Sequence, residues 1–308
     1  MNSNSNPSSG ANLIGVHTRA MLVTAIYRYK GWTKQDPGFA AIIAAQTGAD
    51  PRRVGGSKRL IESDFPELKL LREIKNAAYK HHKEKTLPWD NWSRRLLTSE
   101  CYTEYTQTQR QFKQDYEAAR DALKLRVDDI KAEAKQALGS AYCEEDFADL
   151  DRIDELSAID HEFEPLPDSD RWLQMASTEK DLLVKQTQEQ LQRRVTGAIA
   201  YVAQQLEDSV TTLSERIKRY DDPQDDTNKR WERAWIDNVR SIVQMVPSFN
   251  FVDDPQLERI AKQVEGTILR FSSDELHEDP AARAEVVSSV NDVMDKMSSM
   301  FGAPAGEQ

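Results

Sequence analysis

The chain has 308 residues, of which 39% are hydrophobic and 30% charged, and its formal net charge is −11. This balance is more typical of long solvated helices than of a compact α/β enzyme, and no apolar run reaches the roughly 18 residues of a membrane span. The Asn- and Ser-rich start lacks a signal-peptide pattern and the two cysteines lack CxxC spacing, so we expect free thiols and a cytoplasmic protein without a membrane partner.

The charge is unevenly distributed along the chain. Residues 1–100 contain 16 Lys and Arg against 9 Asp and Glu, whereas the remaining residues contain 25 against 43. Either the two parts attract each other or each faces a different partner. We predict a disordered tail over 1–12, a basic N-terminal part with long helices over 13–220, and a helical module over 229–302.

The first hundred residues predict one strand and two helices. Met21–Lys30 alternates apolar and polar residues, as a half-buried strand does, and Gly31 ends it. Phe39–Gln46 predicts a short apolar helix that Gly48 stops. The turn that includes Gly55-Gly56-Ser57-Lys58 lacks the GxxxxGK[ST] spacing of a phosphate loop, so we interpret it as a flexible basic turn.

Pro66–Lys85 predicts a helix with proline in its first turn. Its neighbouring His81 and His82 point about 100° apart on a helix, and Glu84, three positions after His81, does not by itself complete a metal site. We therefore interpret this stretch as a solvated helix end and predict no metal or cofactor. Thr86–Asp90 follows, and because Pro88 cannot continue a helix, we expect an ordered connector whose tryptophans pack on the helices that follow.

Two long segments, Ser99–Leu138 and Asp170–Tyr220, repeat apolar residues at steps of three and four. Such stripes need partners, and we predict that the two segments form an antiparallel hairpin of coiled-coil type. The stripes are Tyr105, Phe112, Tyr116, Ala119, Leu123, Val127, Ile130, Ala134 and Leu138, and Leu183, Leu191, Val195, Ile199, Val202, Leu206, Val210, Leu213, Ile217 and Tyr220.

Between them, residues 141–170 form an acidic insert with twelve Asp and Glu and one basic residue, Arg152. The Asp-x-Asp-x-Asp-Gly pattern of a calcium loop is missing, so we interpret the carboxylates as the solvated face of a short helix that buries Leu150, Ile153 and Leu156. His161–Pro167 predicts an edge strand that pairs with Met21–Lys30.

Residues 221–228 predict an acidic linker before the C-terminal module. We expect its first helix to end at Pro247, and Asp254-Pro255 and Asp279-Pro280 to begin the next two. The predicted fold is therefore mainly α: a long antiparallel helical hairpin, a small two-stranded β element and a C-terminal helical module.

The linear order of these features resembles a family of tailed-phage and prophage proteins known only as a domain of unknown function. The resemblance covers roughly residues 20–300. It rests on Met21–Trp32, Thr86-Leu87-Pro88-Trp89 with Arg95-Leu96-Leu97, the long helix from Tyr102, Phe163–Pro167, Trp235–Asn238, Phe249-Asn250 and Asp254-Pro255. It implies a phage origin and a mainly helical body, with a MoxR-like AAA+ ATPase as a candidate neighbour, and it supplies no catalytic residues.

The five histidines stand in no Ser-His-Asp or HExxH context, so we predict a non-enzymatic protein. The leading hypothesis is a phage interaction or adaptor protein that forms a homo-oligomer or partners an AAA+ ATPase. A second is nucleic-acid binding through basic residues interleaved with aromatic ones. The alternative is that these basic residues dock on the acidic remainder of the chain. A third is a DNA mimic that inhibits a host enzyme through its carboxylates. The candidate nucleic-acid contacts are Arg28, Lys30, Arg52, Arg53, Lys58, Arg59, Lys83 and Lys85, and the candidate acidic partner surface is Glu144, Glu145, Asp146, Asp149, Asp151 and Asp154.

Overall fold

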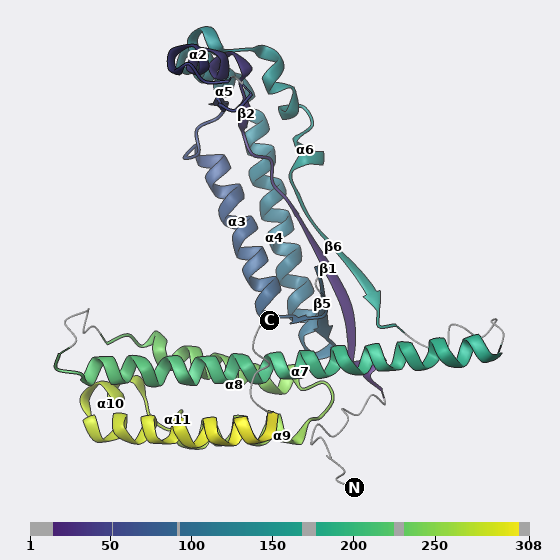
Figure 1. Cartoon of the computed structure of the whole chain (residues 1–308), viewed down its shortest axis with the longest axis vertical. Coiled ribbons are helices and arrows are strands. Elements are labelled where there is room, and N and C mark those ends of the chain that lie inside the picture. Colours follow the sequence, from purple (N-terminus) through teal and green to yellow (C-terminus); the bar gives the residue numbers. More distant parts are fainter. Residues whose placement is uncertain (1–14, 51, 91–92, 168–176, 225–230, 302–308) are drawn as a thin grey trace. The chain divides into compact units, whose positions relative to one another are not determined.

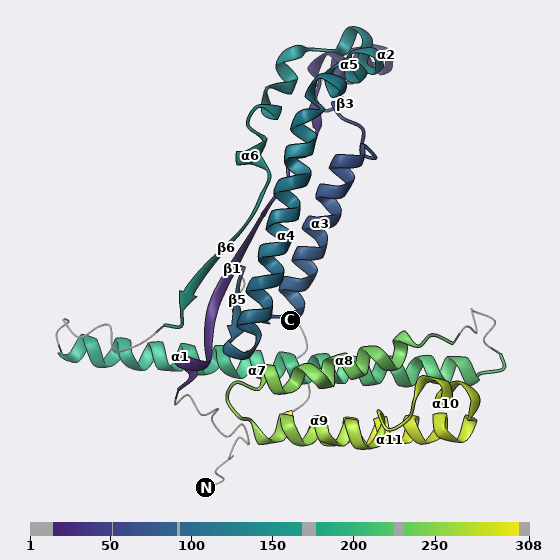
Figure 2. The same cartoon turned by 180° about the vertical axis from the view of Figure 1, so that it is seen from behind.

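A computed structural model describes residues 15–50, 52–90, 93–167, 177–224 and 231–301 (Figures 1 and 2). The chain is mainly helical with a small antiparallel sheet, and it divides into two compact units. Unit 1 comprises 1–23, 86–102 and 163–308, and unit 2 comprises 24–85 and 103–162. The predicted tail over 1–12 lies outside the described residues, as does part of the predicted linker over 221–228.

The long helix of unit 2 pairs with the helix that precedes it in the chain. Helices α3 (Pro66–Glu84) and α4 (Ser99–Leu125) lie side by side in Figures 1 and 2. Glu67 contacts Arg126, the carbonyl of Ala78 accepts a hydrogen bond from Gln109, and Lys85 pairs with Glu104. Because the partner number falls as the α3 number rises, the two helices are antiparallel.

The apolar stripe of α4 continues into α5 (Val127–Leu138), but the helix is interrupted at Arg126. At this interruption the Arg126 side chain pairs with Glu67 and Asp129 and lies over the ring of Phe65. Beyond α5 come the short turns η1 (Gly139–Ala141) and η2 (Glu144–Leu150) and the one-turn helix α6 (Ile153–Leu156). The predicted single helix over Ser99–Leu138 is thus two helices.

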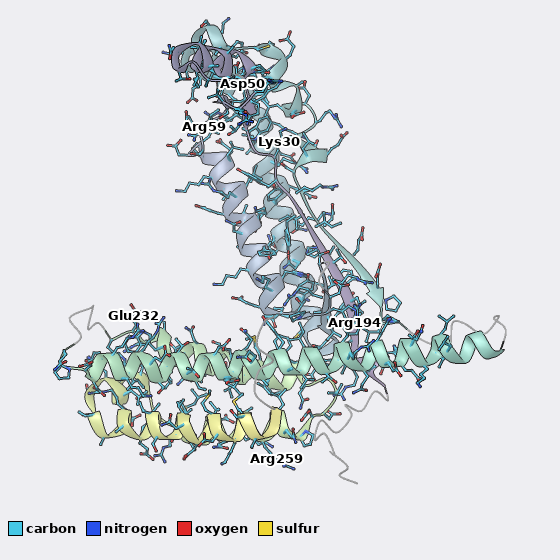
Figure 3. The ribbon with its side chains drawn as sticks, viewed as in Figure 1. Lys30, Asp50, Arg59, Arg194, Glu232 and Arg259 are labelled. Carbon is cyan, nitrogen blue, oxygen red and sulfur yellow. The ribbon has the colours of Figure 1, made fainter. Side chains whose placement is uncertain are left out.

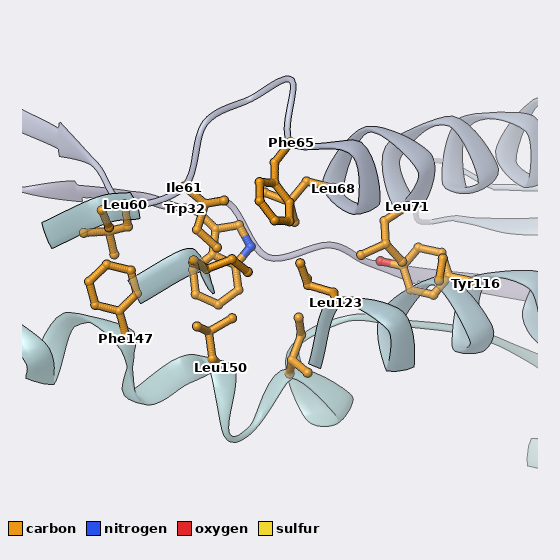
Figure 4. Packing of buried hydrophobic residues seen from close by; sticks show 14 of the residues in the cluster. Trp32, Leu60, Ile61, Phe65, Leu68, Leu71, Tyr116, Leu123, Phe147 and Leu150 are labelled. Carbon is orange, nitrogen blue, oxygen red and sulfur yellow. The ribbon is translucent and has the colours of Figure 1, made fainter. Parts of the chain in front are cut away.

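One apolar core joins these elements (Figure 4). It takes residues from α3, from α4 and from the acidic insert. Their aliphatic and aromatic side chains pack together and so remove apolar surface from water. Its members include Trp32, Leu60, Ile61, Phe65, Leu68, Leu71, Tyr116, Leu123, Phe147 and Leu150. The insert therefore buries an apolar side, as predicted, with Leu150 and Ile153 only 2% and 1% exposed, whereas Leu156 is half-buried.

The antiparallel sheet has four strands in the order β4-β5-β1-β6, and the division between the units crosses β1, β6 and α4. Strands β1 (Ala20–Arg28) and β6 (Ala158–Pro165) are neighbours, with β6 at an edge, which confirms their predicted pairing. The connector contributes two further strands that were not predicted, β4 (Leu87–Pro88) and β5 (Arg94–Thr98). A second, two-stranded sheet pairs β2 (Thr33–Gln35) with β3 (Ser57–Arg59).

In unit 1 the second long helix, α7 (Ser177–Asp221), packs on α8 (Ala234–Phe249) and α11 (Pro280–Phe301). Between these come α9 (Pro255–Thr267) and α10 (Ser273–Glu278), and the short α1 (Val16–Arg19) precedes β1. The predicted stripe is buried from Leu191 to Ile217. Trp89 of the connector also packs on α7, where the Arg194 guanidinium lies 5.5 Å from its ring centre, and Figure 3 labels Arg194 on this helix. Trp92 lies outside the described residues.

Three sequence predictions need correction or restriction. The hairpin between the two long helices is not confirmed, because α4 pairs with α3 in unit 2 while α7 packs on α8 and α11 in unit 1. The β element has more than two strands. Finally, α8 continues through Pro247 to Phe249, because a proline so close to the end of a helix removes only one late hydrogen bond.

Candidate interaction surface

Helix α2 (Pro37–Thr47) is built by strong local signals and carries no charge. The Asp36 carboxylate caps its start by accepting hydrogen bonds from the amides of Gly38 (2.9 Å) and Phe39 (3.3 Å). Pro37 occupies the first turn, where its missing N–H is not needed. Gly48 ends the helix in the left-handed conformation, with φ of +69°, which glycine adopts without steric cost.

An apolar helix of this kind is normally buried, yet α2 is mostly exposed. Its only buried residue is Ala44, while Phe39 and Ile42 keep 41% and 54% of their surface accessible. Ala41 and Ala45 are exposed as well. At about 100° per residue, Phe39, Ala41, Ile42 and Ala45 cover an arc of about 160°, and exposed Gln46 lies within it.

A close backbone contact holds α2 on unit 2. The amide of Asp36 donates to the carbonyl of Gly56 (2.9 Å), and a Cβ at position 56 would lie 2.7 Å from the Phe39 Cβ and 2.8 Å from the Ala40 nitrogen. Only glycine fits against the first turn of the helix here. Position 56, which the sequence analysis assigned to a flexible turn, is therefore a packing point.

Beneath this contact lies an ion cluster that joins β2, β3 and the acidic insert. Lys58, only 9% exposed, places its Nζ 2.6 Å from Asp146 and 3.4 Å from Asp36, and it donates to the carbonyl of Ala141 (2.8 Å). Lys34 reaches the same Asp146 carboxylate at 2.6 Å. Hydrogen bonds from Lys34 and from Lys58 hold the pKa of Asp146 below its usual value, so this carboxylate stays ionised.

Most of the predicted basic contacts are partnered within unit 2. Six of the eight form ion pairs: Arg28 with Asp160, Lys30 with Asp149, Arg52 with Asp50, Lys58 with Asp146, Arg59 with Glu62, and Lys85 with Glu104. Lys83 lies over the Tyr79 ring, and Arg53 is exposed. The set does not form one patch: Arg52, Arg53 and Arg59 lie in or beside the loop after α2, and Figure 3 labels Asp50 and Arg59 near this helix. Lys83 and Lys85 lie at the far end of α3.

The predicted acidic surface is similarly neutralised. Asp146 is buried, and three others have cationic partners: Glu144 with Lys131, Asp149 with Lys30, and Asp154 with Arg120 and Lys124. The Glu145 carboxylate accepts a hydrogen bond from the Cys143 thiol, and Asp151 is exposed. Two pairs, Lys30–Asp149 and Lys58–Asp146, join the two predicted sets, and Arg28 and Lys85 pair with other carboxylates after residue 100. Docking of the basic residues on the acidic remainder, which the sequence left open, therefore accounts for four of the eight.

The C-terminal end of α3 is solvated, as predicted, at Lys80, Lys83 and Glu84, but its histidines belong to a polar cluster that is largely buried. His82 is 3% exposed, with its Nδ1 2.8 Å from the Tyr105 hydroxyl, and His81 stacks on the Tyr105 ring. His161 of β6 meets Tyr105 and Tyr27 edge-on at 5.8 and 6.0 Å. Burial lowers the pKa of His161 to about 4 and also lowers the pKa of His81. The sequence of α3 did not show that its histidines are covered, because they are covered by α4 and β6, which are distant in sequence.

The sequence predicted the α2 helix but did not predict that its apolar side chains are exposed. The composition of Pro37–Thr47 could have indicated this exposure. The stretch is not divided into a polar and an apolar side, so its pattern does not show that one side is buried. In the described part of the chain, no group of three or more His, Cys, Asp and Glu side chains is arranged to hold a metal ion. No described helix has the length and apolar content needed to cross a bilayer.

Comparison of the chain with protein-family models, with curated proteins and with solved structures finds no match. The resemblance to a phage family therefore stays a prediction.

Proposed function

We propose that this chain is a non-enzymatic interaction protein and that α2 is the element through which it contacts its partner. The observation that carries the proposal is the exposure of Phe39 and Ile42 on an uncharged helix whose two ends are locally capped. Exposed apolar surface costs free energy in water, and a helix without a polar side is a common feature of binding sites. The Gly56 contact and the Lys58 ion cluster hold this helix in a fixed position, so a partner would meet an ordered surface.

The two alternative functions receive less support from the same residues. A nucleic-acid interface needs several cations able to neutralise phosphates, but Lys58 is buried and Lys30 and Arg28 already face Asp149 and Asp160. A DNA mimic needs a dense array of carboxylates without counter-charges, and most of the predicted acidic set has basic partners.

Co-purification from the host cell tests the proposal. The tagged full chain and a Phe39→Gln/Ile42→Gln variant are compared by mass spectrometry of what co-purifies. Leu70→Gln is the matched control, since Leu70 is 47% exposed on the outer side of α3. We expect one stoichiometric partner to be lost with the α2 variant and kept with the control, and an AAA+ ATPase is the partner suggested by the phage resemblance. Equal recovery with all three chains would contradict a role for α2.

A further inference from the structure

The side chain of Gln109, on α4, joins that helix to α3 through a single nitrogen atom. Its Nε2 donates to the carbonyl of Ala78 (2.9 Å) and lies 3.1 Å from the Nδ1 of His81. A carbonyl oxygen only accepts, so the amide nitrogen rather than the amide oxygen must face Ala78, and its second hydrogen serves His81. The Nδ1 of His81 is therefore an acceptor, and the neutral ring carries its proton on Nε2.

A second proton on the His81 ring is incompatible with this arrangement. The protonated ring has an N–H at both nitrogens, so its Nδ1 would face the Gln109 amide as donor against donor. Rotation of the amide would bring its oxygen to Nδ1 but would also set that oxygen against the Ala78 carbonyl. The Tyr27 hydroxyl still donates to this carbonyl (3.1 Å), but in either case the bond from α4 to α3 through Gln109 is lost. Gln109 is only 2% exposed, so water does not easily replace that bond.

The other nitrogen of the ring offers no alternative acceptor. The Nε2 of His81 is buried without a hydrogen-bond partner among the described residues, and so is the Nε2 of His161. Both rings contact the ring of Tyr105, His81 by stacking and His161 edge-on, each with 5.8 Å between ring centres. Two protonated rings would therefore place like charges on either contact of one buried tyrosine.

The charged groups around the cluster do not compensate a proton on His81. The titratable and charged groups that face the cluster are Glu84, Lys85 and His82 at the end of α3, Glu104, Tyr105 and Lys113 on α4, Tyr27 and Arg28 on β1, and Asp160 and His161 on β6. Glu104 already pairs with Lys85 (2.8 Å), and Asp160 with Lys113 (2.7 Å). Burial and then Lys85 lower the pKa of His81, while Glu104 and Glu84 raise it, and the lowering prevails.

We propose that the contact between His81 and Gln109 is a pH-sensitive latch, which holds the C-terminal end of α3 on α4 at neutral pH and releases it in mild acid. The segment released is 78–84, which also carries the hydrogen bond between His82 and Tyr105. The latch goes beyond the proposed function and does not depend on α2. A histidine that titrates normally only when the latch is open shifts the equilibrium toward the open form as the pH falls below about 6.5.

Hydrogen exchange of the full chain, followed by mass spectrometry at about pH 7.5 and about pH 5, tests the latch. Labelling times are scaled to the intrinsic exchange rate at each pH, and peptides of α9, which contains no histidine, are the internal reference. We expect protection over 78–84 to fall about five- to thirtyfold more than that of α9, the range set by a histidine whose pKa drops by about one unit or more on closing.

Matched variants separate the latch from general acid sensitivity. His81→Asn keeps an acceptor near the place of Nδ1 but does not titrate, so it should keep the protection at neutral pH and abolish most of the acid effect. His17→Gln, at an exposed position, should behave as the unaltered chain does. Gln109→Met removes the donor and should lower protection over 78–84 at neutral pH already, with a smaller further loss in acid.

A nuclear magnetic resonance titration of the unaltered chain gives a second measurement, which decides if a variant fails to fold by circular dichroism. The side-chain amide signals of Gln109 should shift together with the ring signals of His81 as the pH falls. Protection over 78–84 that falls no more than that of α9, or a fall that His81→Asn leaves intact, would overturn the latch. So would Gln109 amide signals that stay constant while the His81 ring titrates.

Discussion

Mild acid should destabilise unit 2 through His161. Burial holds the pKa of this side chain at about 4, against 6.5 for an ordinary histidine, so the fold favours the neutral ring. The groups around it have opposing effects: Asp160 raises its pKa, while Lys113 and His81 lower it. The Nε2 atom of His161 is buried without a hydrogen-bond partner among the described residues, so a proton there would gain no acceptor.

The sign and size follow from proton linkage. A histidine whose pKa is lowered by folding contributes its full stability above the unfolded pKa of about 6.5 and loses it as the pH falls toward the folded pKa. The interval from 6.5 to about 4 corresponds to about 3 kcal/mol at 1.36 kcal/mol per pH unit. Because His161 is only half-buried and water screens its charge, we expect about 2 kcal/mol, lost mainly between pH 6.5 and 4.5.

Urea unfolding followed by circular dichroism at pH 7.5, 6.5, 5.5 and 4.5 measures this loss. His161→Gln removes the titrating ring, and its free energy of unfolding should change with pH by about 2 kcal/mol less than that of the unaltered chain. His17→Gln, at an exposed position, is the matched control and should follow the unaltered chain. Identical pH dependence with and without His161 would refute the reasoning. In that case other groups, such as carboxylates at lower pH, would carry the acid sensitivity.

Three further substitutions test the attachment of α2 and the caps. Gly56→Ala should loosen α2 at a cost of about 1–3 kcal/mol, seen as faster hydrogen exchange of its amides, whereas Gly55→Ala, where a Cβ meets nothing within 4 Å, should not. Lys58→Met should lower the free energy of unfolding in urea by about 3 kcal/mol, because the buried Asp146 carboxylate loses one of its two cations. Lys34→Met, at a half-exposed position, should lower it by less than about 1 kcal/mol. Equal losses would contradict the greater weight given to the buried pair. Asp254→Ala should lower the thermal stability of unit 1 by about 1 kcal/mol, since its carboxylate caps α9 through two amides; an unchanged melting temperature would show that the cap is dispensable.

Local signals in the sequence determined where many elements begin and what they bury. Asp254 and Asp279, each followed by a proline, start helices as predicted, because an N-cap carboxylate and a proline without an amide act within four residues of chain. Asp36-Pro37 acts in the same way and starts α2 two residues before the predicted Phe39. The apolar periodicity also identified the buried sides of α4, α5 and α7, since helical spacing needs no knowledge of the partner.

What those sides meet was decided only by the tertiary structure. The apolar stripe of α4 packs on α3, and that of α7 packs on α8 and α11. An apolar stripe shows which side of a helix is buried, but it does not specify which element covers that side. The same holds for charge. Composition showed basic and acidic regions, but only folding brought Lys58 onto Asp146 and Lys30 onto Asp149, which neutralises part of both candidate surfaces. For α2 too, the sequence predicted an apolar helix but not its surroundings: the helix packs on Gly56, and Ala44 is its one buried residue.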